Sequence, residues 1–151
     1  MKVNIPITKP YLGEDEKRLI SEVIDSGWIS QGPMVAEFEK RFAEYVGAKY
    51  AVATTSCTTA LHAALSLSGV STGDEVIVPS LSFIATANTA VHCGATPVFV
   101  DIDPETCNID VNKIEEAITE KTKVIMPVHQ MGLPSEIDSI KKIAAKHGLK
   151  I

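Results

Sequence analysis

Apolar positions recur along the chain with two different spacings, and the change falls near residue 50. Before that point they lie three and four residues apart, which is typical of helices that bury one face. The first such segment runs from Glu14 to about Asp25 and is followed by Gly27, a residue suited to a C-terminal cap. The second begins near Pro33, which suits a first helical turn, and ends at Gly47. We therefore expect two amphipathic helices joined by a short loop.

After residue 50, short apolar runs alternate with helical segments. The expected strands are residues 50–53, 75–78, 97–100 and 123–128, with a further strand beginning at 149–151. The expected helices are residues 57–67, 83–92, 111–118 and 135–147. This rhythm predicts an α/β fold with a mostly parallel sheet covered by helices. Ligands of such sheets bind at the carboxyl ends of the strands, so the loops there are the candidates for chemistry.

Small hydroxyl residues gather in one of these loops, between the first expected strand and the helix that follows it. The run 54–59 reads Thr-Thr-Ser-Cys-Thr-Thr. The start of a helix leaves backbone N–H groups without partners and carries partial positive charge, and small side chains let an anion approach. The run is therefore a candidate phosphate site. Serine and threonine are also ordinary helix caps, and by itself the run favours that simpler interpretation.

Composition and charge exclude several classes of partner. The net charge is −5 and no cluster of lysine or arginine overrides it, which argues against a nucleic-acid or anionic-membrane surface. The apolar runs are of strand length, too short to span a bilayer, and the first residues lack the apolar core of a signal peptide. Three cysteines at unrelated spacings fit free thiols in a reducing compartment, and no metal-ligand pattern is present. We expect a cytoplasmic protein without a metal site.

The last residues are strand-like, and a domain rarely stops where an apolar strand begins. We therefore expect the 151 residues to be the front part of a longer protein.

Several segments agree in order and spacing with one family. They are GWISQGPMVAEFEKRFAEYVGAKYAVATTSCTTALHAAL, GDEVIVPSLSFIATANTAVHCGATPVFVDIDPETCNID and KTKVIMPVHQMGLPSEIDSIKKIAAKHGLKI. Together they resemble the DegT-type sugar aminotransferases, pyridoxal-phosphate (PLP) enzymes that aminate nucleotide-linked keto-sugars. The resemblance covers essentially the whole chain. It implies a type I aminotransferase-like fold, with residues 1–151 as part of the large, cofactor-binding domain and a helical segment over about 1–47. The rest of that domain and a C-terminal small domain would lie outside the sequence.

The resemblance implies a cofactor-binding role for four residues. Cys57, Thr58 and Thr59 would hold the phosphate of PLP, although family members often have glycine in place of Cys57. Phe83, in PSLSF, matches the aromatic position that stacks on the pyridine ring. Without the resemblance, Phe83 would be interpreted as the first core residue of its helix.

Four further residues are candidates for contact with the substrate. Trp28, Ser30 and Gln31 belong to a loop that in the family lies near the active site and the subunit interface. His129 follows a strand, where an imidazole could reach the pocket and transfer protons. Each has a simpler alternative: Trp28 could pack on the preceding helix, and His129 could hydrogen-bond loop backbone.

A group of carboxylates, Asp101, Asp103 and Glu105, has a simpler explanation than catalysis. Asp-Pro-Glu-Thr is a turn signature, so we expect a turn followed by a helix cap.

The family's reaction needs two groups that do not match any position here. A lysine forms a Schiff base with the cofactor, and an acid faces the pyridine nitrogen; both are expected beyond Ile151. The resemblance thus implies part of a PLP-dependent aminotransferase of amino sugar and polysaccharide biosynthesis. The enzyme would be a homodimer that takes an amino group from an amino acid, glutamate being the favoured donor, and passes it to the sugar.

The 151 residues alone are expected to be inactive. Two alternatives stay open. One is a PLP-dependent sugar dehydratase of the same family, which has histidine in place of the lysine. The other is a non-catalytic truncated or split-subunit fragment.

Overall fold

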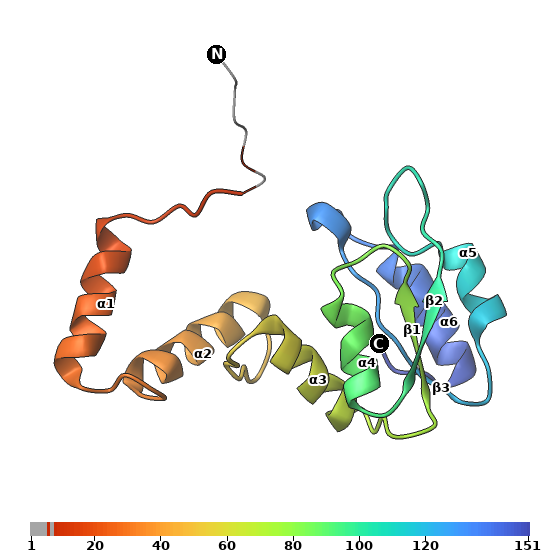
Figure 1. Cartoon of the computed structure of the whole chain (residues 1–151), viewed down its shortest axis with the longest axis horizontal. Helices are drawn as coiled ribbons and strands as arrows, with labels where there is room; N and C mark the ends of the chain where they lie inside the picture. The colour runs from red at the N-terminus through yellow and green to blue at the C-terminus, as the bar shows by residue number, and fades with distance from the viewer. Residues whose placement is uncertain (1–5, 7) are drawn as a thin grey trace, which may run out of the picture. The chain divides into compact units, whose positions relative to one another are not determined.

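The chain forms two compact units, Met1–Ala53 and Thr54–Ile151, in a computed structural model that describes residues 6 and 8–151. The helices and strands of both units are labelled in Figure 1.

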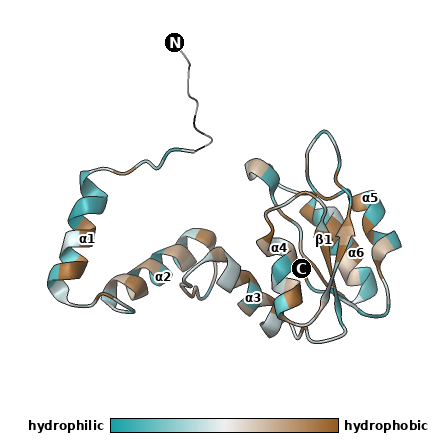
Figure 2. Ribbon diagram, viewed as in Figure 1, coloured by the Kyte–Doolittle hydropathy of each residue, from teal (hydrophilic) through white to brown (hydrophobic). Residues whose placement is uncertain are grey.

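The first unit contains the two helices expected from the sequence. They are α1 (Glu14–Ser26) and α2 (Pro33–Val46). Gly27 and Gly47 follow them with φ of 74° and 70°, left-handed conformations that glycine adopts without a steric penalty. The hydropathy colouring shows apolar residues along both helices (Figure 2).

The expected strand over residues 50–53 is wrong, because the structure gives these residues no strand. A strand needs a hydrogen-bonded neighbour, which an apolar run does not by itself provide. Here the N–H of Ala53 donates instead to the side chain of Glu39 at 2.8 Å. Tyr50 and Val52 are exposed and bury no face.

The second unit is the predicted α/β structure. Its strands are β1 (Glu75–Pro79), β2 (Thr96–Val100) and β3 (Thr122–Ile125). Its α-helices are α3 (Cys57–Leu67), α4 (Ala85–His92), α5 (Val111–Ile114) and α6 (Ile137–His147). Two 3₁₀ turns, η1 (Glu115–Ala117) and η2 (Gln130–Gly132), complete it. The sheet order is β2-β1-β3 with both pairings parallel, so the predicted fold class is confirmed.

The central strand β1 divides the core of this unit into two layers. Val76 and Val78 pack in a cluster with Leu65 of α3 and Ala90 of α4. Ile77, between them in sequence, packs in the opposite cluster with residues of α5 and α6. In Figure 1 α4 accordingly lies on one side of the strands, with α5 and α6 on the other. The alternation follows from the two-residue period of a strand.

Three element boundaries lie two or more residues from those expected. β3 ends at Ile125 rather than at 128, since Pro127 has no N–H to continue the ladder. α6 begins at Ile137 rather than at 135, because Ser135 is engaged in the preceding loop. α4 begins at Ala85, leaving Phe83 in the loop.

The expected helix over 111–118 is also shorter, with its second half tightened into η1. The strand expected at 149–151 is present as one parallel bridge, between Lys150 and Val124. None of the helices found in residues 6 and 8–151 has the length and apolar character needed to cross a membrane.

Candidate functional site

A cavity of about 630 Å³ lies in the second unit where β1 and β3 end and α3 begins. Three segments separated in sequence form its walls: the first turn of α3, the loop from β1 into α4, and the loop from β3 towards α6. Its lining residues are Cys57, Thr58, Leu61, Ser82, Phe83, Ala85, Thr86, Met126, Pro127, Val128, Gln130 and Met131. The cavity therefore occupies the position at which parallel sheets bind ligands.

The first turn of α3 gives the cavity its hydrogen-bond donors. Ser56 caps the helix, accepting the N–H of Thr59 on its Oγ at 3.2 Å. The N–H groups of Cys57 and Thr58 begin the helix, so they point beyond its end without an intrahelical acceptor. Both residues line the cavity, with Cys57 exposed and Thr58 half-buried. This end of the cavity suits an anion.

Thr59 differs from its two neighbours. Its N–H is taken by the Ser56 cap, and its hydroxyl lies 3.0 Å from Ser56 Oγ and 3.2 Å from Thr55 Oγ1. It orders the turn and does not line the cavity. A direct contact between Thr59 and phosphate therefore stays a prediction.

Phe83 supplies an aromatic face to the same cavity. It is 76% exposed and lies in the loop before α4, so it is not the core residue that the simpler interpretation required. Next to it, the hydroxyls of Ser82 and Thr86 lie 2.7 Å apart and tie the loop to the first turn of α4. The structure thus brings together Cys57, Thr58 and Phe83, which are 26 residues apart at the widest.

The loop after β3 contributes lining residues that sequence reasoning missed. Gln130 and Met131 face the cavity, and Met131 has a left-handed backbone with φ of 51°. The position of this loop after a strand marked it as a candidate segment. Nothing in the sequence indicated which of its side chains would face the cavity.

His129 is engaged in holding this loop closed. Its Nδ1 accepts the N–H of Ser135 at 3.0 Å, and the Ser135 hydroxyl donates to the carbonyl oxygen of Val128 at 2.7 Å. His129 lines a different cavity, of about 300 Å³. The geometry agrees with the backbone-bonding alternative, and a substrate contact by His129 stays a prediction.

The loop with Trp28 belongs to the first unit. Trp28 and Ser30 line a hollow of about 280 Å³ formed by the end of α1 and the start of α2, and Gln31 is exposed beside it. A Cβ added to Gly32 would lie 3.0 Å from the Cβ of Trp28, so the tryptophan packs closely on that glycine. Trp28 thus helps to shape the turn between the two helices, and substrate binding by Trp28, Ser30 or Gln31 stays a prediction.

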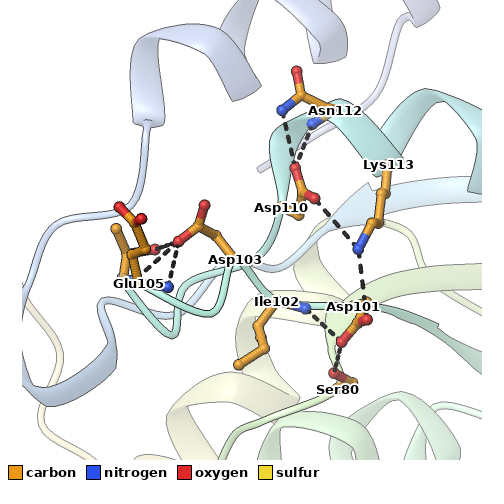
Figure 3. Close-up of polar contacts among 9 residues, drawn as sticks. Ser80, Asp101, Ile102, Asp103, Glu105, Asp110, Asn112 and Lys113 are labelled. Atoms are coloured by element: carbon orange, nitrogen blue, oxygen red, sulfur yellow. Dashed lines mark hydrogen bonds and ion pairs between the residues drawn. The ribbon is translucent and has the colours of Figure 1, made fainter.

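The carboxylates after β2 form a turn, as expected (Figure 3). Asp103 accepts the N–H groups of Thr106 and Glu105 at 2.9 and 2.8 Å, and these bonds lower the pKa of its carboxyl group. The N–H of Ile102, together with Lys113 and Ser80, lowers the pKa of Asp101. No cluster of three or more metal-ligating side chains occurs among the residues that the structure describes.

A sequence model of the DegT/DnrJ/EryC1/StrS aminotransferase family matches residues 10–151. The chain belongs to this family. It is 50% identical over 145 residues to the spore coat polysaccharide biosynthesis protein SpsC of Bacillus subtilis, covering 96% of this chain and 37% of SpsC. It is 49% identical over 148 residues to the GDP-perosamine synthase of Caulobacter vibrioides, covering 97% of this chain and 40% of the synthase. The chain thus spans well under half the length of these relatives.

A solved structure of the family shows the same fold. Spr1654 of Streptococcus pneumoniae, assigned as a sugar aminotransferase, matches in its PLP form with a TM-score of 0.91 and 38% identity. The match covers 99% of this chain and 38% of Spr1654. The same protein has also been solved in its pyridoxamine phosphate (PMP) form. The prediction of a PLP cofactor is therefore confirmed at the level of the family.

The cavity fits such a cofactor by its chemistry. N–H groups and a threonine hydroxyl at one end match a phosphate, and Phe83 with apolar side chains elsewhere matches a flat ring. The volume of about 630 Å³ lies within the range of roughly 300–1,000 Å³ that small-molecule sites occupy.

Proposed function

We propose that this chain is the N-terminal part of the cofactor-binding domain of a PLP-dependent sugar aminotransferase. One observation carries the proposal: a single cavity at the carboxyl ends of parallel strands joins Cys57 and Thr58 of α3 to Phe83. Family membership and the PLP-bound and PMP-bound neighbour support the choice of cofactor.

Two of these residues would hold the phosphate. Thr58 would donate through its N–H and hydroxyl, and Cys57 through its N–H, with the positive end of the α3 dipole adding to both. A backbone donor does not depend on the side chain, so a cysteine at this position would serve as well as a glycine.

Phe83 would fix the plane of the cofactor ring. An aromatic face restrains a stacked ring without exchanging protons with it. When bound, PLP supplies an electron-withdrawing ring that stabilises negative charge at the reacting carbon. The protein's own task here is therefore to bind and orient, and the chemistry at the ring belongs to groups that we place beyond Ile151.

We further propose that the complete enzyme takes its amino group from an amino acid, glutamate being the first to test, and gives it to a nucleotide-linked keto-sugar. The relatives named for spore coat polysaccharide biosynthesis and for GDP-perosamine synthesis support a sugar nucleotide of the same class. A homodimer is expected, for which the exposed apolar residues of α1 and α2, such as Ile20 and Phe38, offer surface. The three free cysteines agree with a reducing cytoplasm.

The proposed function is tested by adding glutamate to the PLP-bound protein and following the absorbance of the cofactor. The full-length protein is loaded with PLP and mixed with glutamate in the absence of sugar. We expect the PLP band to be replaced by that of PMP, and 2-oxoglutarate to appear in equal amount. An unchanged band with glutamate and with the other common amino acids would refute the aminotransferase proposal.

A further inference from the structure

The cavity wall between β3 and α6 is held by a buried side chain that does not itself line the cavity. Asn108 follows β2 and is 5% exposed. Its Oδ1 accepts the N–H of Gln130 at 2.9 Å. Its Nδ2 donates to the carbonyl oxygens of Leu133 and Pro134 at 3.1 and 3.3 Å. One carboxamide therefore bonds the loop on both sides of Met131.

The three bonds match a carboxamide and no other side chain of that size. They need one acceptor and two donors at the end of a short side chain, and asparagine has both. A carboxylate would keep the bond from Gln130 but would face two carbonyl oxygens without a proton to share. An apolar residue would leave an N–H and two carbonyl groups without their partner, which is costly in a buried place.

Asn108 is itself fixed by the turn before it. Its carbonyl accepts the N–H of Asp103 at 2.9 Å, and its own N–H donates to Thr106 Oγ1 at 3.3 Å. The Asp103 carboxylate closes the same turn through the N–H groups shown in Figure 3. The turn after β2 therefore fixes Asn108, and Asn108 in turn bonds the loop after β3.

Backbone strain lies on both sides of this contact. Cys107 and Met131, with φ of 60° and 51°, are the non-glycine residues in the left-handed region within the described part of the chain. Cys107 directly precedes Asn108, and Met131 lies in the loop that Asn108 holds. Such conformations cost free energy and persist where surrounding bonds enforce them.

We propose that Asn108 is a positioning residue of the cofactor cavity. It holds the loop that carries Gln130 and Met131 in the conformation that completes the cavity wall. The identity of the ligand rests on the function proposed above, whereas the hold of Asn108 on the loop does not.

The test uses the full-length protein and three variants. Asn108→Ala removes all three bonds, and Asn108→Asp keeps only the acceptor for Gln130. The matched control is Asn112→Ala, since Asn112 is an exposed asparagine nearby whose side chain bonds Asp110 at 3.1 Å. Amide hydrogen exchange, thermal unfolding and the binding of PMP are measured for each. PMP needs no Schiff base, so its affinity reports the noncovalent contacts alone.

We expect Asn108→Ala to speed exchange at the Gln130 amide by about ten-fold, the effect of losing one hydrogen bond. The dissociation constant of the Asn108→Ala variant for PMP should rise several-fold, while amide exchange in β1 stays slow. In Asn108→Asp the Gln130 amide should stay protected. The Leu133 N–H, which donates to the Gln130 carbonyl at 2.9 Å, should exchange faster, because the carbonyl groups of Leu133 and Pro134 are no longer held by Asn108. Asn112→Ala should match the wild type in the exchange of the loop amides and in its affinity for PMP.

Two results would overturn the proposal. One is wild-type PMP affinity in a variant whose loop amides exchange faster. The other is faster exchange spread evenly over β1 and β3, which would show general destabilisation in place of a local hold. If Asn108→Ala does not fold, Asn108→Asp decides by the same criteria. A wild-type protein that binds no PMP would refute the proposed function, and the Gln130 amide would still decide whether Asn108 holds the loop.

Discussion

Truncation of Phe83 separates its role in binding from any role in folding. The side chain is 76% exposed, so Phe83→Ala removes little buried surface and should change the free energy of unfolding by no more than about 0.5 kcal/mol. Stacking of two aromatic rings contributes about 0.5–1.5 kcal/mol beyond burial. That energy corresponds to an increase of about two- to thirteen-fold in the dissociation constant for PMP.

Two further variants make the test specific to the aromatic face. Phe83→Tyr keeps a π-face and should bind PMP nearly as well as the wild type, whereas Phe83→Leu keeps apolar volume alone and should resemble alanine. Phe99→Ala is the matched control, because Phe99 is also exposed, at 60%, but lies on β2 and does not line the cavity. Fluorescence titration with PMP gives the affinities, and urea unfolding gives the stabilities.

Either of two results would refute the stacking role of Phe83. Unchanged PMP affinity in Phe83→Ala would mean that the cavity does not hold the ring against this side chain. A loss of several kcal/mol of stability would mean that Phe83 belongs to the core despite its exposure.

Four other expectations concern the second unit. Gly94→Ala should cost about 2–4 kcal/mol in urea unfolding, since its φ is +76° and the new Cβ would lie 2.5 Å from Thr72 Oγ1. Gly148→Ala, also left-handed but with open space around it, should cost about 1–2 kcal/mol. In Asp103→Asn the free energy of unfolding should fall less steeply than in the wild type as the pH is lowered. PMP should slow the reaction of a maleimide with Cys57, measured by mass spectrometry, and leave the other two cysteines unaffected.

The sign of the acid effect follows from the pKa of Asp103, which the N–H groups of Thr106 and Glu105 lower from the ordinary 3.8. Its stabilisation is present above 3.8 and is lost as the pH falls through the lower pKa of the folded state. Asp138→Asn is the control, because the Asp138 side chain is 94% exposed and meets Lys141 only at 3.7 Å. If the free energy of unfolding falls equally steeply with pH in Asp103→Asn and Asp138→Asn, the stabilising role of the Asp103 carboxylate is contradicted.

Equal costs for the two glycine variants would contradict the predicted overlap with Thr72. Labelling of Cys57 at the same rate with and without PMP would place the phosphate elsewhere.

Local pattern predicted most of the fold. The helices α1, α2 and α3 begin and end within a residue of the expected positions, because a glycine or serine cap marks their ends in the sequence. The parallel sheet followed from the alternation of strands and helices. The pattern failed at residues 50–53, where an apolar run has no partner strand, and at α6, where Ser135 bonds the loop instead of beginning the helix.

The sequence named some of the residues that line the cavity, but not those of the loop after β3. Family resemblance pointed to Cys57, Thr58 and Phe83, and these three line one cavity. The roles of Gln130, Met131 and Asn108 could not be predicted, since each depends on contact between loops more than twenty residues apart.

The sequence alone therefore determined the order and type of most elements, and it named the candidates for binding a phosphate and a ring. Periodicity, caps and motifs are local properties, and a chain carries them before it folds. The tertiary structure decided which residues meet. The first turn of α3 and Phe83 line the same cavity, and the side chain of Asn108 bonds the loop that forms one wall of it. Thr59 and His129 instead form hydrogen bonds with residues close to them in the sequence. Such contacts depend on how β1 and β3 align in register, which no single segment of the sequence contains.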